Sequence, residues 1–140
     1  MILVGPRGWI DLWSDLRPSL TTTRYACLDR RWKSVVLYHR DGHRYSIALI
    51  EPPRRFNFLT RALAATVYNP VIQARLHYQR DGRYDIEELR GSIRRAIEAD
   101  DDVLTQFHDA DELIALLGSA QTFDTIVSVL RYAETDDRTP

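Results

Sequence analysis

The sequence predicts an α+β domain, built as a small antiparallel β-sheet with flanking helices and a C-terminal cluster of three short helices. Two β-rich runs flank the pair Asp41-Gly42, which is typical of a tight hairpin turn. From Asp85 onward, apolar residues recur at helical spacing behind capping residues. No linker is evident in the 140 residues, so we expect one domain over residues 1–135 and a disordered tail at 136–140.

The N-terminal part is expected to begin with a helix over residues 9–17, which Pro18 ends. The polar and β-branched residues 19–25 then predict a connection that leads into a strand. The helix is predicted from the spacing of one apolar helical face, formed by Trp9, Trp13, Leu16 and Leu20.

The hairpin around Asp41-Gly42 is the clearest local signal. Its two arms, residues 32–40 and 43–51, carry apolar side chains on both faces, which indicates central strands covered on each side. Pro52 and Pro53 are expected to end the second strand, because proline cannot donate to a strand ladder.

A further helix and a further strand are expected after the hairpin. Asn57 suits the N-cap of a helix that Pro70 ends, and residues 71–80 alternate as a half-buried strand with one wet face. The pair Asp81-Gly82 is interpreted as a second use of the same turn chemistry rather than as a duplication. The apolar face of the helix consists of Leu59, Ala62, Leu63, Thr66 and Val67.

Three short helices are predicted at the C-terminal end. Asp85 and Glu88 have the spacing of a capping box, and Asp109 and Glu112 repeat that spacing. Gly118 suits the C-cap of the second of these helices. Thr122 suits the N-cap of the last one, whose apolar face is Phe123, Ile126, Val127 and Leu130.

Charge is unevenly spread along the chain. Residues 1–97 contain seventeen basic and nine acidic side chains, net +8, whereas residues 98–140 contain two basic and eleven acidic side chains, net −9. Such asymmetry marks an electrostatic interaction surface, or it is neutralised internally when the two parts pack together. The sequence leaves both interpretations open.

Targeting features are not evident. No apolar run is long enough to cross a membrane, and residues 1–9 lack the long apolar core of a signal peptide. The single cysteine, Cys27, permits no internal disulfide, which fits a reducing environment. We therefore expect a cytoplasmic protein.

The most acidic stretch is residues 98–113, EADDDVLTQFHDADEL, in which an apolar knot of Val103, Leu104 and Phe107 is expected to form a buried connector. Its second half opens a helix, where the helix dipole favours carboxylates. Its first half closes a helix, where the dipole disfavours them, so these acids have no folding explanation. The alternatives for them are a binding surface or compensation by nearby arginines such as Arg94 and Arg95.

Catalytic and metal chemistry is not indicated. His39 and His43 are four residues apart, but the Asp41-Gly42 turn is expected to separate them onto different strands. Cys27 lies in an apolar, strand-like context and is expected to pack as a small hydrophobe. We find no phosphate-binding loop, dinucleotide fingerprint or calcium loop, and we expect neither an enzyme nor a cofactor.

Nucleic acid is the alternative partner, because basic residues alternate with aromatic ones in the first half of the chain. No known nucleic-acid module matches, and the chain as a whole is slightly acidic, so we regard this partner as the weaker hypothesis. The residues that motivate it are Arg30, Arg31, Trp32, Lys33, Arg40, His43, Arg44, Tyr45, Arg75 and His77.

Residues 84–132 resemble the C-terminal part of small bacterial immunity proteins from contact-dependent growth inhibition and related polymorphic toxin systems. The shared pattern is a helix, a D-D-x-L-T-Q-F segment, an acidic D-E-L helix and a short helix begun near T-F-D. The resemblance implies a cytoplasmic, non-catalytic antitoxin. It would bind and neutralise the C-terminal domain of one cognate toxin, often a nuclease, by blocking its active site or substrate groove.

A carboxylate-rich surface can occupy the basic groove of a nuclease, speed association and set specificity, and aromatic side chains can anchor such a contact. We therefore predict a toxin-binding set in which the three consecutive aspartates at 100–102 are the leading candidates. The set consists of Asp100, Asp101, Asp102, Asp109, Asp111, Glu112, Trp32 and Tyr45.

Overall fold

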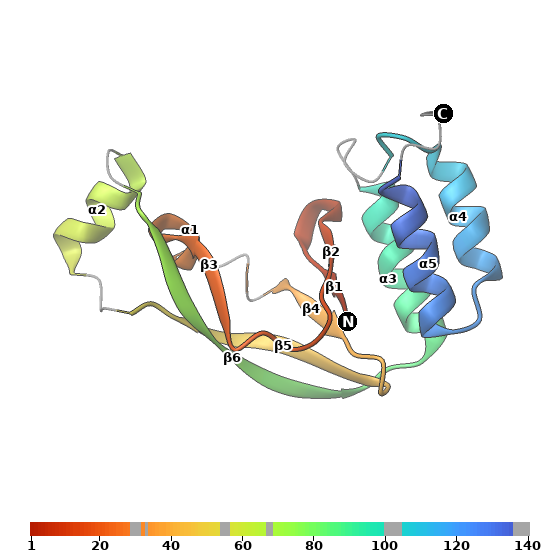
Figure 1. The fold of residues 1–140 in the computed structure, drawn as a ribbon, viewed down its shortest axis with the longest axis horizontal. Helices are drawn as coiled ribbons and strands as arrows, with labels where there is room; N and C mark the ends of the chain where they lie inside the picture. Colours follow the sequence, from red (N-terminus) through yellow and green to blue (C-terminus); the bar gives the residue numbers. More distant parts are fainter. Residues whose placement is uncertain (29–31, 33, 54–56, 67–68, 100–104, 136–140) are drawn as a thin grey trace.

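A computed structural model gives the fold of the chain (Figure 1) and describes residues 1–28, 32, 34–53, 57–66, 69–99 and 105–135. The predicted α+β class is confirmed. The strands are β1 (Ile2–Val4), β2 (Ile10–Leu12), β3 (Ser19–Thr23), β4 (Val36–Tyr38), β5 (His43–Glu51) and β6 (Val71–Arg83). The helices are η1 (Pro6–Gly8, 3₁₀), α1 (Arg24–Leu28), α2 (Phe58–Thr66), α3 (Ile86–Glu98), α4 (Ala110–Ser119) and α5 (Phe123–Ala133).

The six strands form one antiparallel sheet in the order β2-β1-β4-β5-β6-β3. In Figure 1 the long β5–β6 pair forms a curved arm. The helices α3, α4 and α5 group at one end of this arm, and α1 and α2 lie at the other end. The predicted tail, residues 136–140, lies outside the described residues.

Each face of the sheet has its own core. Directly paired residues of neighbouring strands point to the same face, so the strand register shows which core each pair joins. Ile2 and Tyr38 are register partners and pack with the buried residues of α3, α4 and α5. Leu3 and Leu37 are the next pair, so they face the opposite side. There they join a second core that contains Trp13, Val35, Ile47 and Leu76.

The predicted hairpin is confirmed, with its turn at Asp41-Gly42 between β4 and β5. Gly42 has φ of 84°, the left-handed conformation that such a turn requires, and its N–H donates to His39 O over 3.0 Å. β5 ends at Glu51, directly before Pro52, as predicted. The expectation that both strands are covered on each face is wrong for the far part of β5, since Leu49 is 55% exposed.

Replacing Gly42 with alanine is expected to lower the free energy of unfolding by about 1 kcal/mol, because a Cβ at positive φ is strained. The space around Gly42 is open, so the cost is purely conformational. Gly118→Ala is the matched control, because Gly118 also has open space but lies inside α4. There alanine should stabilise by about 0.5–1 kcal/mol in chemical denaturation. Effects of the same sign at both positions would contradict this account.

The predicted helix over residues 9–17 is wrong. Residues 10–12 form β2, which pairs with β1. The backbones of Trp13 and Met1 bond in both directions, with N···O distances of 3.0 and 2.8 Å. Trp13 and Leu16 of this segment do reach the second core, whereas Trp9 is 38% exposed. They reach it from extended chain, because β1 supplies the backbone partners that a helix would have found within itself.

The segment that follows is also more regular than predicted. Residues 19–23, expected as a connection, form strand β3, which pairs with β6. Cys27, expected in a strand-like setting, lies in helix α1, where it is half-buried. Burial raises the pKa of its thiol, so the reactive thiolate is disfavoured.

The second Asp-Gly pair does not form a turn, and this prediction is wrong. Asp81 and Gly82 continue β6, which runs through to Arg83. Gly82 has φ of 124° at a register shift, where its partner on β5 is Arg44 and the partner of the next residue, Tyr45, is Arg80. Glycine therefore serves here to allow a β-bulge, with Asp81 as the extra residue.

The C-terminal helices form where their caps predict them. The Asp85 side chain accepts from the Glu88 N–H over 2.7 Å, and Thr122 forms a full capping box with Thr125. Asp109 is the N-cap of α4, but its side chain makes no capping hydrogen bond. Gly118 lies within α4, whose C-cap is Ala120, so its predicted role as the C-cap is wrong.

Helix α2 begins directly after Asn57, the predicted N-cap, but the apolar side chains at its start are not buried. Phe58 is 88% and Leu59 is 64% exposed. Among the described residues, no helix combines the length and the apolar character that crossing a membrane would require.

Candidate functional site

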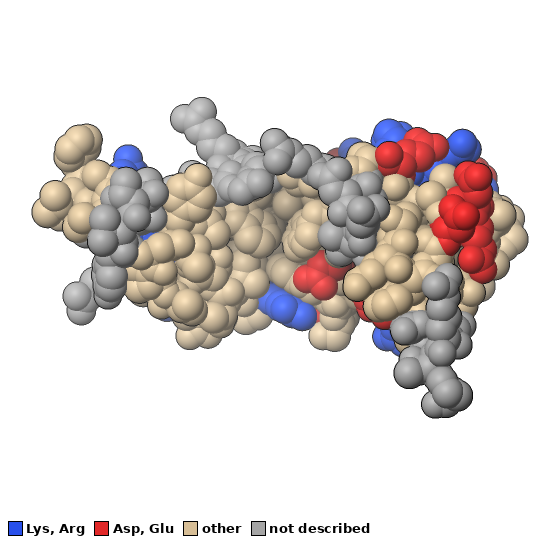
Figure 2. Space-filling model, turned by 90° about the horizontal axis from the view of Figure 1, so that it is seen from above, with Lys and Arg blue, Asp and Glu red and all other residues tan. Residues whose placement is uncertain are grey.

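The acidic end of the helical cluster contains the part of the predicted binding set that the structure describes best. Asp109, Asp111 and Glu112 are exposed at the start of α4. Figure 2 shows acidic side chains gathered over this helical end, with basic side chains among them. Asp100, Asp101 and Asp102, the leading candidates, lie outside the described residues, as do Val103 and Leu104.

Glu112 has a role within the fold. One of its carboxylate oxygens accepts from the Tyr132 hydroxyl over 3.0 Å, and the other lies 3.8 Å from His108 Nδ1. The His108 ring packs on Tyr132 with centroids 3.9 Å apart, and its Nε2 lies 3.0 Å from the Thr135 carbonyl. These contacts join the start of α4 to the end of α5, so Glu112 holds the acidic end together.

Asp109 and Asp111 are different, because neither forms an ion pair within the part of the chain that the structure describes. Both lie in or before the first turn of α4, where the positive end of the helix dipole favours negative charge. Their carboxylates are therefore stable where they stand and remain open to a partner. Of the predicted set, these two best fit a contact surface.

A shallow hollow lies beside these acids. It runs from the end of α3 to the start of α4, and Phe107, expected in a buried connector, is only half-buried in its wall. Glu98 also lines the hollow, but its carboxylate is already paired, because Arg94 Nε donates to it over 2.8 Å. The hollow is lined by Ile97, Glu98, Thr105, Gln106, Phe107, His108, Asp109 and Ala110.

The two aromatic candidates lie elsewhere. Trp32 and Tyr45 pack against the second core, on the face of the sheet that does not carry α3. Trp32 meets Trp9 edge to face at 5.9 Å, and Tyr45 meets His39 in the same way at 6.3 Å. The structure therefore does not bring the five described residues of the predicted set into one site. Asp109, Asp111 and Glu112 lie at the start of α4, whereas Trp32 and Tyr45 lie on the opposite face of the sheet.

Two surface arginines near the hairpin turn are paired with carboxylates of the helices. Arg40 NH2 lies 2.6 Å from the Asp124 carboxylate of α5, and this pair joins the basic and the acidic segments of the sequence. Arg44 pairs with Glu88 of α3, but both of these residues belong to the basic segment. These pairs also occupy two of the cations that suggested nucleic-acid binding, while Arg30, Arg31 and Lys33 lie outside the described residues.

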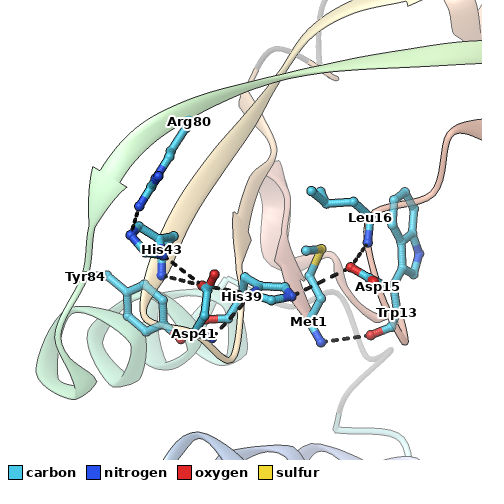
Figure 3. Close-up of polar contacts among 9 residues, drawn as sticks. All are labelled: Met1, Trp13, Asp15, Leu16, His39, Asp41, His43, Arg80 and Tyr84. Atoms are coloured by element: carbon cyan, nitrogen blue, oxygen red, sulfur yellow. Dashed lines mark hydrogen bonds and ion pairs between the residues drawn. The ribbon is translucent and has the colours of Figure 1, made fainter.

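A polar cluster missed by the sequence reasoning surrounds the hairpin turn (Figure 3). The turn separates His39 and His43 onto its two sides, as expected, but it also brings both rings close to one carboxylate. It places Asp41 between them, with Asp41 Oδ1 at 2.8 Å from His39 Nδ1 and 3.1 Å from His43 Nδ1. Asp15 lies 3.7 Å from His39 Nε2, and Arg80 donates to His43 Nε2. The tight turn itself was the signal, because it brings residues on its two sides together.

The contacts around the turn determine the charge state of Asp41. Arg80 donates to Nε2 of His43, so this ring nitrogen is an acceptor, whereas His43 Nδ1 lies 3.1 Å from Asp41 Oδ1 without forming a hydrogen bond. The Asp41 N–H approaches His39 Nδ1 at 3.3 Å, but the 2.8 Å contact with the carboxylate assigns that nitrogen as a donor. Desolvation disfavours the Asp41 carboxylate. Hydrogen bonds from the His39 side chain and the His43 N–H outweigh it and lower the pKa of Asp41 to about 2.

Asp41→Asn is expected to reduce stability more at about pH 5 than at about pH 2. The folded pKa of about 2 lies below the ordinary value of 3.8, so the ionised form stabilises the fold above about pH 4 and this contribution is lost as the pH falls toward 2. Urea unfolding at the two pH values measures the difference in free energy of unfolding between the wild-type protein and the variant. If this difference is not smaller at pH 2 than at pH 5, the carboxylate charge does not stabilise the turn.

The side chains around the hairpin turn are not arranged as a metal centre in the described part of the chain. Across the described ranges, no group of three or more histidine, cysteine, aspartate or glutamate side chains is arranged to hold a metal ion. No protein family, curated protein or solved structure with which the chain was compared matches it.

Proposed function

We propose that this chain is an immunity protein that binds the C-terminal domain of a cognate toxin, of the nuclease class, and neutralises it by covering its active site or substrate groove. The observation that carries the proposal is a pair of exposed carboxylates at the acidic end of the helical cluster, Asp109 and Asp111, which form no ion pair with any residue that the structure describes. The resemblance of residues 84–132 to immunity proteins of polymorphic toxin systems supports it.

The physical basis is electrostatic complementarity. A nuclease presents cations where it holds phosphates, and a fixed acidic surface can take the place of those phosphates. Glu112 holds the start of α4 against α5 through Tyr132, so the neighbouring acids are presented on a supported element. In this proposal Trp32 and Tyr45 stabilise the second core rather than contact the toxin.

The proposal requires neither catalysis nor a cofactor, and it places the protein in the cytoplasm, where the toxin meets its substrate. Nucleic-acid binding is the weaker candidate, because Arg40 and Arg44 are already paired with carboxylates of α5 and α3.

The test is co-expression with the variable C-terminal domain of a large exoprotein encoded immediately upstream. We expect the two chains to co-purify as a stoichiometric complex, and we expect cells that express both to survive the toxin. Absence of association at micromolar concentration, together with absence of protection, would reject the proposal. Salt-dependent binding of the isolated protein to RNA or DNA would support the nucleic-acid alternative.

A further inference from the structure

The outer edge of β3 carries backbone groups that the sheet does not use. β3 is the terminal strand and pairs only with β6. The Leu76 N–H donates to Pro18 O over 3.0 Å, and the Arg24 N–H donates to Pro70 O over 3.1 Å. Both contacts belong to the same register and fix which residues of β3 bond inward, namely the even-numbered ones, Leu20 and Thr22.

The odd-numbered residues therefore direct their N–H and C=O groups outward. These are Ser19, Thr21 and Thr23, and within the described residues no other strand pairs with their outer side. Thr23 also caps α1, since its hydroxyl accepts from the Ala26 N–H, so Ser19 and Thr21 are the residues whose outward groups are least engaged. The edge is accessible, since Thr21 is exposed and its neighbours on β3 are half-buried. An edge of this kind is a template for a further strand.

We propose that the outer edge of β3 pairs antiparallel with β3 of a second copy of this chain, about a twofold axis at Thr21. Each Thr21 then exchanges both N–H···O=C bonds with its own counterpart, and Ser19 lies opposite the counterpart of Thr23. The two six-stranded sheets become one continuous sheet across the interface. This interface is isologous, the arrangement that closes as a dimer.

The composition of β3 favours its own copy as the occupant. The strand Ser19-Leu20-Thr21-Thr22-Thr23 has no charge, so pairing with itself brings no like charges together. Threonines opposite one another suit cross-strand pairing, and Thr21, the central outward residue, is the one that a twofold axis requires. Between Ser19 and Thr23 there is none of the lysine or proline that commonly protects an edge.

The opposite edge of the sheet shows the contrast. β2 has only three residues, with Asp11 at its centre. The Asp11 carboxylate accepts from the Leu12 N–H over 2.8 Å and from Trp13 Nε1 over 2.7 Å. This edge is short and charged, and one of its backbone donors is already satisfied. Self-pairing is therefore assigned to β3.

The experiment is sedimentation equilibrium of the full chain over a range of concentrations. We expect the wild-type protein to dimerise and Thr21→Lys to weaken dimerisation by roughly thirtyfold or more, because two lysines would face each other across the axis. Thr21→Pro should have a similar effect by removing the outward N–H, which the β3–β6 ladder does not use. Gln73→Lys is the matched control. Gln73 is the partner of Thr21 on β6, so this variant adds the same charge one strand away from the edge.

Amide hydrogen exchange keeps the test independent of the variants. Protection of the Thr21 and Thr23 amides should rise with protein concentration, whereas Leu20 and Thr22 should be protected at every concentration. A wild-type protein that stays monomeric at high micromolar concentration would overturn the proposal. So would a dimer that Thr21→Lys leaves intact, or one that Phe58→Ser on α2 abolishes while Thr21→Lys does not. Each outcome is independent of whether the chain binds a toxin.

Discussion

Leu89→Ala is expected to lower the free energy of unfolding by about 2–5 kcal/mol. Leu89 lies on α3, is fully buried and packs in the core that joins the sheet to α4 and α5. Truncation removes apolar contacts and leaves a cavity that three packed helices and a sheet cannot close. Urea or guanidinium denaturation of the isolated protein measures the loss.

Leu59→Ala provides the matched control, because it removes the same atoms from a side chain that is 64% exposed on α2. It should change the stability by no more than about 0.5 kcal/mol. Comparable losses for the two variants would mean that α2 is covered in solution, and the exposed apolar face described above would then be incorrect.

Asp111→Lys is expected to slow association with the toxin domain roughly tenfold at low ionic strength. The substitution puts a cation on the acidic end, where Asp111 is exposed and has no ion pair among the described residues. A basic partner would then meet repulsion where it met attraction. Stopped-flow association measures the rate, and the effect should shrink as salt is raised toward physiological strength, because exposed charges are screened.

Asp81→Lys separates position from total charge. It changes the net charge by the same amount at an exposed residue of β6, which lies shortly before the start of α3 rather than at the start of α4. We expect it to alter the association rate much less than Asp111→Lys does. Equal slowing by both variants would show that the toxin senses only the overall charge, and it would remove Asp109 and Asp111 as the contact surface.

The candidate site was predictable only in part. The helix start at Asp109 was predictable, because acids at the start of a helix have a physical explanation, and the structure has Asp109 as the N-cap of α4. The leading candidates at 100–102 were chosen because they lacked such an explanation, and they lie outside the described residues. The different roles of Glu112, which bonds within the fold, and Asp111, which remains open to a partner, were not predictable. They depend on Tyr132 of α5, whose hydroxyl folding brings to 3.0 Å from the Glu112 carboxylate.

Local chemistry was sufficient wherever the partner of a backbone group is only a few residues away. Asp41-Gly42 defines the hairpin turn, Asp85 and Thr122 begin α3 and α5, and Pro52 ends β5. In each case the deciding hydrogen bond or steric restriction involves sequence neighbours. The α+β class follows from such signals, which is why composition and spacing determined it.

Only the tertiary structure decided the features that depend on distant partners. The segment with Trp9 and Trp13 has helical spacing, yet it pairs as β2 because β1 lies beside it. Asp81-Gly82 has the residues of a turn, yet it continues a strand because β5 supplies the partners across a bulge. The unused outer edge of β3 likewise follows from its register with β6. The sequence thus determined where the chain can turn and where helices start, and long-range pairing decided which extended segments became strands, because a strand's hydrogen bonds always belong partly to another segment.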